Sequence, residues 1–210
     1  MTVFVLFTWI PAQSLAAQIV WQENFESGLT GEWKTVTFDA PQTSYIVGKE
    51  GTNGFLRAHS TKSASGIARE LKIPLTPGTT LEWRWKIDKI PQGGSDAKIQ
   101  TFDHTARLYV AFKSFMGLPR IINYVWANEE KAGVIFNHPR SDRSRFIVLR
   151  SGNAGAGGWL AEKRDVFADW QKLFGDKTPP PISAIGVMTD SDGTETVVTG
   201  CYDELRLTKP

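Results

Sequence analysis

Cysteine is almost absent from this chain of 210 residues, in which Cys201 is the single thiol. One cysteine excludes an intrachain disulfide and any metal site built from several thiolates. A domain of this length can build a sufficient core without such crosslinks. Because Cys201 lies in an alternating stretch, we interpret it as a small buried residue on a strand rather than a nucleophile.

Runs of one charge and long apolar runs are also missing. The 24 basic and 22 acidic residues give a formal net charge of +2, without a cluster of lysine and arginine. This balance argues against a nucleic-acid partner. The apolar stretch near the N-terminus, residues 3–10, is too short to span a bilayer, so we expect no transmembrane segment.

Common catalytic and cofactor motifs are absent as well. The chain has no G-x-S-x-G, H-E-x-x-H or P-loop sequence. Residues 151–159, SGNAGAGGW, are rich in glycine, and we interpret them as a mobile surface loop or as a lid over a binding face. The sequence therefore specifies no reaction.

The N-terminus has the order of a secretory signal. Residues 3–10 are apolar, and small residues such as Ala16 and Ala17 follow. This order predicts a signal peptide over residues 1–17, with cleavage after Ala16 or Ala17, and hence an exported protein. The alternative is a buried N-terminal strand or helix.

Alternation of apolar and polar residues dominates residues 18–210. Turn-forming clusters such as EGTNG, IPQGGSD and TDSDGT separate many short candidate strands. This pattern predicts a single all-β domain, an antiparallel β-sandwich similar to a jelly roll. One segment has helical spacing instead, and it predicts a short helix near residues 165–175 that ends at Gly175.

The stretch LEWRWKI, residues 81–87, places two tryptophans in an apolar row. Trp83 and Trp85 share a strand face with two aliphatic residues, which predicts core rather than a sugar-stacking platform. Arg84 and Lys86 lie on the opposite face. The polar face is therefore the candidate for function.

A second strand has a similar polar side. In ARLYVAFK the apolar row leaves Arg107 and Tyr109 on the other face. If both strands lie in one sheet, Arg84, Lys86, Arg107 and Tyr109 form a basic patch suited to a glycan that carries carboxylates. The alternative is an ordinary solvated sheet face.

Carboxylates supply two further candidates. Asp203 falls in an apolar row with Cys201 and Leu205 if no bulge intervenes, so it needs a cation, hydrogen bonds, a metal or a place at the sheet rim. Asp190 and Asp192 begin a D-x-D-G stretch that is either a turn or part of a calcium loop.

Several of these segments together resemble a known family. FESGLTGEW, LEWRWKI, ARLYVAF, INYVWA, the run from SGNAGAGGW to FG, and GVMTDSDGT are similar to the bacterial exported family called domain of unknown function 3047. The family motif has two acidic residues before the A-R-x-Y-V strand. Here Asp103 is present, but Phe102 occupies the other position, which weakens any role for an acidic pair. The resemblance implies no settled activity.

A broader likeness is to jelly-roll carbohydrate-binding modules, because the chain opens with NFESG and closes with YDELRL. In those modules a glutamate near the first strand and an aspartate in the last strand hold a structural calcium. The likeness implies Glu26 and Asp203 as calcium ligands, completed by carbonyl oxygens of the GKEGTNG turn.

Three functions follow as hypotheses. The first is an exported, non-catalytic β-sandwich in the periplasm or outside the cell that binds carbohydrate or an envelope glycan through its polar sheet face. The second is a polysaccharide lyase or glycoside hydrolase on a jelly-roll scaffold, with Asp103, His104 and Tyr109 as catalytic candidates. Arg69 or Arg107 would neutralise a uronate, and Asp190 or Asp192 would complete a hydrolase pair. The third is a periplasmic protein-interaction module.

Overall fold

The computed structural model describes residues 17–113, 117–176 and 178–210. Residues 1–16, which make up nearly all of the expected signal peptide, lie outside the described part, so that expectation stays a prediction. Among the described residues, no helix has both the length and the apolar character needed to cross a membrane.

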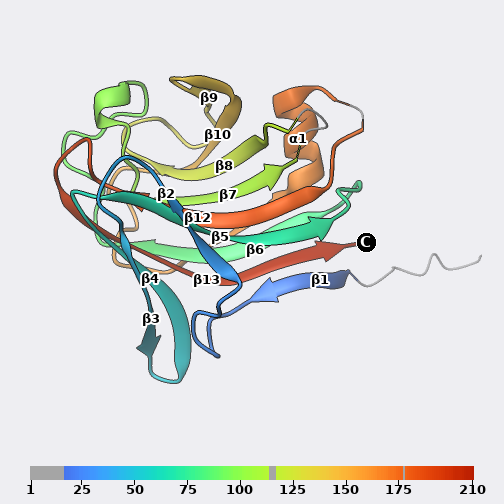
Figure 1. The fold of residues 1–210 in the computed structure, drawn as a ribbon, viewed down its shortest axis with the longest axis horizontal. Coiled ribbons are helices and arrows are strands. Elements are labelled where there is room, and N and C mark those ends of the chain that lie inside the picture. Colours follow the sequence, from blue (N-terminus) through green and yellow to red (C-terminus); the bar gives the residue numbers. More distant parts are fainter. Residues whose placement is uncertain (1–16, 114–116, 177) are drawn as a thin grey trace, which may run out of the picture.

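The described chain forms a sandwich of two sheets, which confirms the predicted fold class (Figure 1). Sheet A has six strands in the order β11-β6-β13-β4-β3, with β1 beside β13, and sheet B has seven in the order β2-β5-β12-β7-β8-β10-β9. Neighbouring strands run antiparallel, except that β10 runs parallel to β8. The strands are β1 (Gln18–Glu23), β2 (Trp33–Thr37), β3 (Ser44–Glu50), β4 (Asn53–Thr61), β5 (Ala64–Ile73), β6 (Thr80–Ile87), β7 (Ala106–Phe112), β8 (Arg120–Ala127), β9 (Ile135–His138), β10 (Ser141–Ser151), β11 (Leu160–Asp165), β12 (Ile182–Asp190) and β13 (Val197–Lys209).

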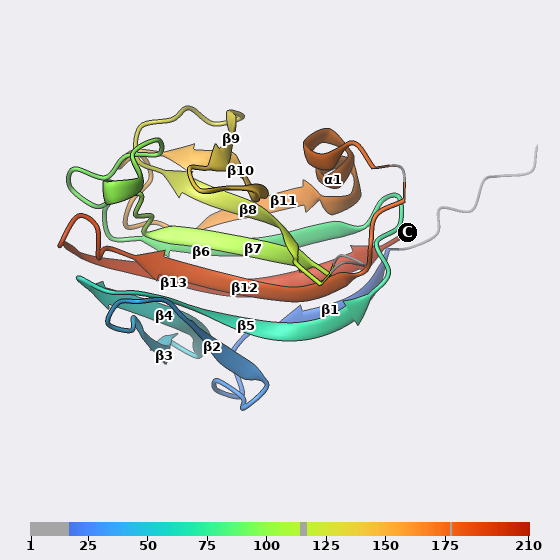
Figure 2. The same cartoon turned by 45° about the horizontal axis from the view of Figure 1, so that its top comes forward.

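The expected helix is present as α1 (Val166–Phe174), at one end of the sandwich beside β11 (Figure 2). The Asp165 carboxylate accepts a hydrogen bond from the Ala168 N–H and caps its start. Gly175 ends the helix with a left-handed φ of 74°, a conformation that glycine adopts without a Cβ clash. Trp170 from α1 is fully buried and packs on Phe112 of β7.

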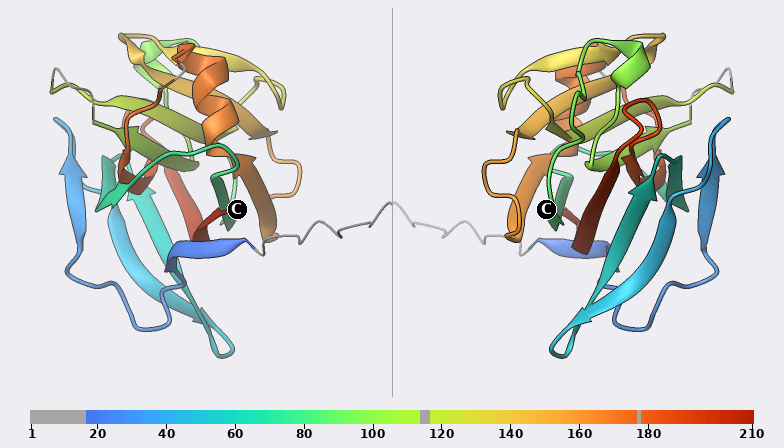
Figure 3. Two further views of the ribbon diagram at one scale, coloured as in Figure 1. Left: turned by 90° about the vertical axis from the view of Figure 1, so that its right-hand side faces the viewer. Right: turned by 90° about the vertical axis from the view of Figure 1, so that its left-hand side faces the viewer.

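The main core lies between the two sheets, which Figure 3 shows from both ends. Trp83 and Trp85 of β6 are 2% and 0% exposed, so both belong to the core as predicted. They pack on Tyr124 and Trp126 of β8, with ring centroids 5.2 and 6.0 Å apart. Burying each such apolar side chain contributes about 1.5–3 kcal/mol to the free energy of folding.

A smaller apolar cluster covers part of the outer face of sheet B. Phe102 packs there on Phe146 of β10, with Val125, Ala127 and Val148 beside it. Phe102 follows the short 3-10 helix η1 (Ile99–Thr101) in the segment that connects β6 to β7. The connecting segment therefore roofs one part of this face and buries the polar residues next to it.

Candidate binding groove

The four predicted ligand-binding residues lie in two groups on opposite faces of the molecule. Arg84 and Lys86 are on β6 in sheet A, whereas Arg107 and Tyr109 are on β7 in sheet B. Because the alternate residues of both strands enter the core, the two groups point outward in opposite directions. The condition for a single basic patch, that both strands share a sheet, is not met.

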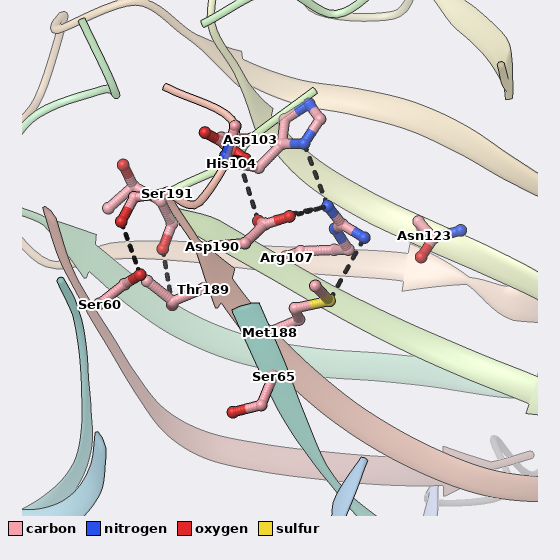
Figure 4. Close-up of polar contacts among 12 residues, drawn as sticks. Ser60, Ser65, Asp103, His104, Arg107, Asn123, Met188, Thr189, Asp190 and Ser191 are labelled. Atoms are coloured by element: carbon pink, nitrogen blue, oxygen red, sulfur yellow. Dashed lines mark hydrogen bonds and ion pairs between the residues drawn. The ribbon is translucent and has the colours of Figure 1, made fainter. Parts of the chain in front are cut away.

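On sheet B, Arg107 belongs to a buried polar network with Asp190 and His104 (Figure 4), and His104 in turn contacts Asp96. Its guanidinium Nη2 donates to Asp190 Oδ2 at 3.0 Å and to His104 Nδ1 at 3.3 Å. It also faces the Phe146 ring at 5.3 Å from the centroid. Arg107 is only 8% exposed, so most of this network is closed to solvent.

His104 is neutral in this network. Arginine can only donate, so Nδ1 of His104 accepts from Arg107, and Nε2 carries the proton that it donates to Asp96 Oδ1 at 3.0 Å. Burial and the nearby Arg107 lower the pKa of His104, which agrees with the neutral ring. Since His104 has no exposed surface and both ring nitrogens are bonded, it offers no nitrogen to a substrate.

Asp103, Asp190 and Asp192 bring oxygen atoms within 4.8 Å of one another. Asp103 Oδ2 accepts from both the N–H and the hydroxyl of Thr194, at 2.6 and 2.7 Å, and so closes the β12–β13 turn. Burial raises the pKa of Asp190 to about 7, against the opposing effect of Arg107. The cluster fits a structural role in the turn, and three oxygens so placed could also hold a cation.

Tyr109 lies flat over Gly186 of β12. A methyl group added at Gly186 would lie 2.2 Å from a carbon of the Tyr109 ring. Burial raises the pKa of Tyr109, so the phenol stays protonated at neutral pH and is not available as a general base. The contacts of the three catalytic candidates thus favour packing and turn closure over proton transfer.

Asp203 does not lie in the apolar row that the alternation predicted. Glu204 has a φ of 52°, and the pairing of β13 with β6 is irregular between Asp203 and Arg206. This bulge turns Leu205 into the core while Asp203 stays on the outer face of sheet A. The carboxylate, which has almost no exposed surface, accepts from Arg84 at 2.5 and 3.1 Å.

The two predicted calcium ligands contact adjacent residues of the β3–β4 hairpin. Asn53 Nδ2 donates to Asp203 at 3.0 Å, and the Gly54 N–H donates to Glu26 at 2.9 Å. However, Arg84 already supplies the positive charge at Asp203, and a guanidinium there disfavours a second cation. This arrangement fits calcium poorly, and calcium at Glu26 and Asp203 stays a prediction.

The outer face of sheet A carries a groove of about 680 Å³, which we call the sheet A groove. Its size falls within the range of about 300–1,000 Å³ typical of small-ligand sites. Phe55 and Ile46 supply apolar lining, and most of the other lining residues are polar. The lining residues are Ser44, Ile46, Glu50, Phe55, Arg57, His59, Lys86, Ile87, Asp88, Gly157, Thr199 and Cys201.

Trp159, at the end of the glycine-rich stretch 151–159, lies next to the groove and packs against residues that line it. Its indole packs edge-on against Phe55 and lies 4.8 Å from Arg84 and 4.9 Å from the Lys86 ammonium. Its Nε1 donates to Glu50 at 2.9 Å. Hydrogen bonds from Lys86 and Trp159 lower the pKa of Glu50, which therefore stays ionised at neutral pH and is a poor general acid.

Of the predicted binding residues, only Lys86 lines the sheet A groove, and Arg84 lies beside it under Trp159. Sequence reasoning missed Arg57, His59, Phe55 and Trp159. The stretch FLRAHS alternates, so its polar row was visible, but nothing in the sequence places β4 two strands away from β6. The strand order supplies that information.

The family model described as "Protein of unknown function (DUF3047)" matches residues 31–206, so the chain belongs to this family. This confirms the resemblance in the sequence motifs. No curated protein matches the chain.

Solved structures share the fold at low identity. The chain is similar to "Cellulose induced protein, Cip1", with a TM-score of 0.50, 10% identity, and 89% of this chain and 96% of that chain covered. A family 11 carbohydrate-binding module of a Clostridium thermocellum cellulase gives 0.47 at 12% identity, covering 93% and 95%. The K1 adhesin domain of Lys-gingipain from Porphyromonas gingivalis W83 gives 0.42 at 13%, covering 89% and 96%. At 10% identity the likeness to Cip1 shows a shared fold and no ligand.

Proposed function

We propose that this member of the DUF3047 family is a non-catalytic binding module that holds a carbohydrate in the sheet A groove. The observation that carries the proposal is the composition of the groove. Ile46, which is 52% exposed, provides apolar surface for the C–H face of a sugar, and Arg57, His59 and Thr199 provide polar groups for its hydroxyls.

The chemistry of the groove supports binding rather than catalysis. Its two carboxylates are engaged within the protein: Glu50 bonds Lys86 and Trp159, and Asp88 Oδ1 accepts the N–H groups of Lys89 and Thr199 at 2.8 Å. The low pKa of Glu50 leaves it without a proton to donate at neutral pH. A glycosidase needs one carboxyl group that is protonated.

The test is retention of the purified protein on a panel of polysaccharides that includes cellulose, xylan, polygalacturonate, alginate and peptidoglycan. We expect saturable retention on at least one glycan, with no new reducing or unsaturated ends. Ile46 is 52% exposed, so Ile46→Ser removes apolar contact at little cost in stability. It should weaken binding about fivefold, the equivalent of about 1 kcal/mol.

Val36→Ser is the matched control, because Val36 is a β-branched residue, 37% exposed, on the edge strand β2 of the other sheet. It should leave retention unchanged. Equal losses in both variants would place the glycan elsewhere, and new chain ends would replace the binding module with an enzyme. No retention on the whole panel would leave the protein-interaction hypothesis in its place.

We also propose that the protein works outside the cytoplasm, in the periplasm or after secretion. Strand β1 begins at Gln18, directly after the predicted cleavage sites, which supports removal of residues 1–17 before folding. The mass of the protein recovered from the bacterial periplasm or medium tests this. A chain that still carries residues 1–16 would contradict it.

A further inference from the structure

One row of side chains crosses the centre of the sheet A groove from strand to strand. Arg57 of β4 pairs with Ile46 of β3 on one side and with Cys201 of β13 on the other, and Cys201 pairs with Lys86 of β6. All four residues line the groove. The row therefore has a cation on each side of a cysteine.

Cys201 forms the low point of this row. Its side chain is small and the residue is only 5% exposed, whereas the Arg57 side chain is exposed. Adjacent strands lie about 4.8 Å apart, so the backbones of Arg57 and Lys86 are about 10 Å apart. Side chains as long as arginine and lysine can converge from that distance on one small group above the thiol.

The charges of the groove leave this centre positive. Glu50 neutralises Lys86 from the hairpin end, and Asp88 lies at the other end, where it accepts the Thr199 N–H. Arg57 forms no ion pair with any residue in the described part of the chain. A ligand with a negative group at its centre would meet the unpaired guanidinium and avoid both carboxylates.

We infer that the sheet A groove selects an acidic glycan, whose carboxylate or sulfate lies over Cys201 between Arg57 and Lys86. This inference rests on the proposed glycan-binding function and names its substrate class. The guanidinium presents paired N–H donors that match a carboxylate or a sulfate ester. Lys86 lies on the other side of Cys201, where it shares its charge with Glu50.

The test compares ligands that differ only in charge. Oligomers of galacturonate and of alginate are titrated by calorimetry as free acids and as methyl esters, and a sulfated galactan oligomer distinguishes sulfate from carboxylate. We expect at least one free acid or the sulfated oligomer to bind about tenfold more tightly than its uncharged form. Because the groove is open to solvent, raising the salt should reduce this preference.

Arg57→Gln should weaken binding of the charged form much more than binding of the uncharged form, which loses only one contact to a hydroxyl, and so should remove most of the preference. Lys86→Gln should also reduce the preference for the charged form. It removes a positive charge and leaves Glu50 without its partner, so that this carboxylate repels an acidic ligand. Arg143→Gln is the control, since Arg143 is an exposed arginine on β10 in sheet B and its loss changes the net charge equally.

Three outcomes separate this inference from the proposal on which it rests. Equal binding of acid and ester that Ile46→Ser still weakens would overturn the acidic preference and keep glycan binding. A preference that Arg143→Gln reduces as much as Arg57→Gln would show a general charge effect and also overturn the inference. No binding of any form, charged or neutral, on the full panel would remove the proposed function itself.

Discussion

Arg84 and Asp203 form an ion pair in which the carboxylate side chain is 1% exposed and the guanidinium side chain 24% exposed. Asn53 and the Glu204 N–H add hydrogen bonds to the same carboxylate. The pair joins β6 to β13 in the middle of sheet A, and Trp159 rests on Arg84. A buried carboxylate that loses its cation is costly, because the remaining charge has neither water nor a partner.

We therefore predict that Arg84→Gln lowers the free energy of unfolding by about 2 kcal/mol, less than a fully buried pair because Arg84 is partly exposed. Urea denaturation measures this, with Lys163→Gln, at an exposed lysine on β11, as control.

If Arg84 serves Asp203 in place of a metal, we predict that the melting temperature of the wild-type protein is the same in calcium and in chelator. A clear rise with calcium that Asp203→Asn abolishes would instead support the metal site expected at Glu26 and Asp203.

Single residues also show where sequence reasoning succeeds and where it ends. The alternation in LEWRWKI correctly predicted that Trp83 and Trp85 are core. The same rule failed at Asp203, because one residue with positive φ, Glu204, reverses the face of everything after it. A glutamate carries no sign of that conformation, which glycine or asparagine would have suggested.

Among the elements, the stretch 151–159 and strand β11 are the ones that connect the fold to the groove. The stretch is attached to the end of β6, since Asn153 Oδ1 accepts the Ile90 N–H at 2.9 Å and the Gly157 N–H donates to Ile87 at 2.8 Å. Gly155 and Gly157 adopt φ values of 82° and 84°, which a residue with Cβ would adopt only with strain. These attachments hold Gly157 at the groove and Trp159 against Phe55.

Releasing one attachment should weaken binding more than it weakens the fold. We predict that Asn153→Ala lowers glycan affinity about fivefold, since ordering the freed loop costs about 1 kcal/mol on binding. Its free energy of unfolding should change by less than about 1 kcal/mol. Asn24→Ala is the control, because Asn24 is an exposed asparagine that accepts a backbone N–H outside the groove. Unchanged affinity in Asn153→Ala would mean that the loop plays no part.

Element prediction from the sequence was good for long periodic stretches and poor for edge strands. Helix α1 matched its expected range because its apolar spacing and the glycine after it agree. Strands β3, β9 and β11 were not expected. Strand β9 has only four residues, β11 is largely polar, and β3 has only one neighbour, β4, so their sequences carry little alternation.

At the scale of the whole molecule, the two outer faces have different characters. Part of the outer face of sheet B is roofed by Phe102 and its cluster, and buried polar residues there bond one another around Arg107. The outer face of sheet A is open and carries the groove. Buried polar networks of the first kind stabilise a unique structure, whereas an open groove with an unpaired cation suits a ligand.

The assignment of strands to sheets was beyond sequence reasoning for a physical reason. Strands β6 and β7 are consecutive in the chain, and consecutive strands are often neighbours in one sheet. Here residues 88–105 carry the chain from one sheet to the other. Alternation shows which residues share a face of one strand but not which strands share a sheet, so Arg84 and Arg107 were grouped although they face opposite ways.

Cys201 allows the central claim, a glycan in the sheet A groove, to be tested at one atom. It is the chain's single cysteine, and it lies in the groove. Burial raises the pKa of its thiol to about 11. Because the thiolate is the reactive form, the rate of its reaction with a small thiol reagent should rise about tenfold for each unit by which the pH increases, as long as the pH stays below that pKa.

The measurement is the rate of Cys201 modification at pH 9, followed by mass spectrometry, with and without a saturating amount of the glycan that retains the protein most tightly. We predict that the bound glycan slows modification at least about fivefold, because it covers the thiol. An unchanged rate while retention shows the glycan to be bound would place the ligand on another face and contradict the account.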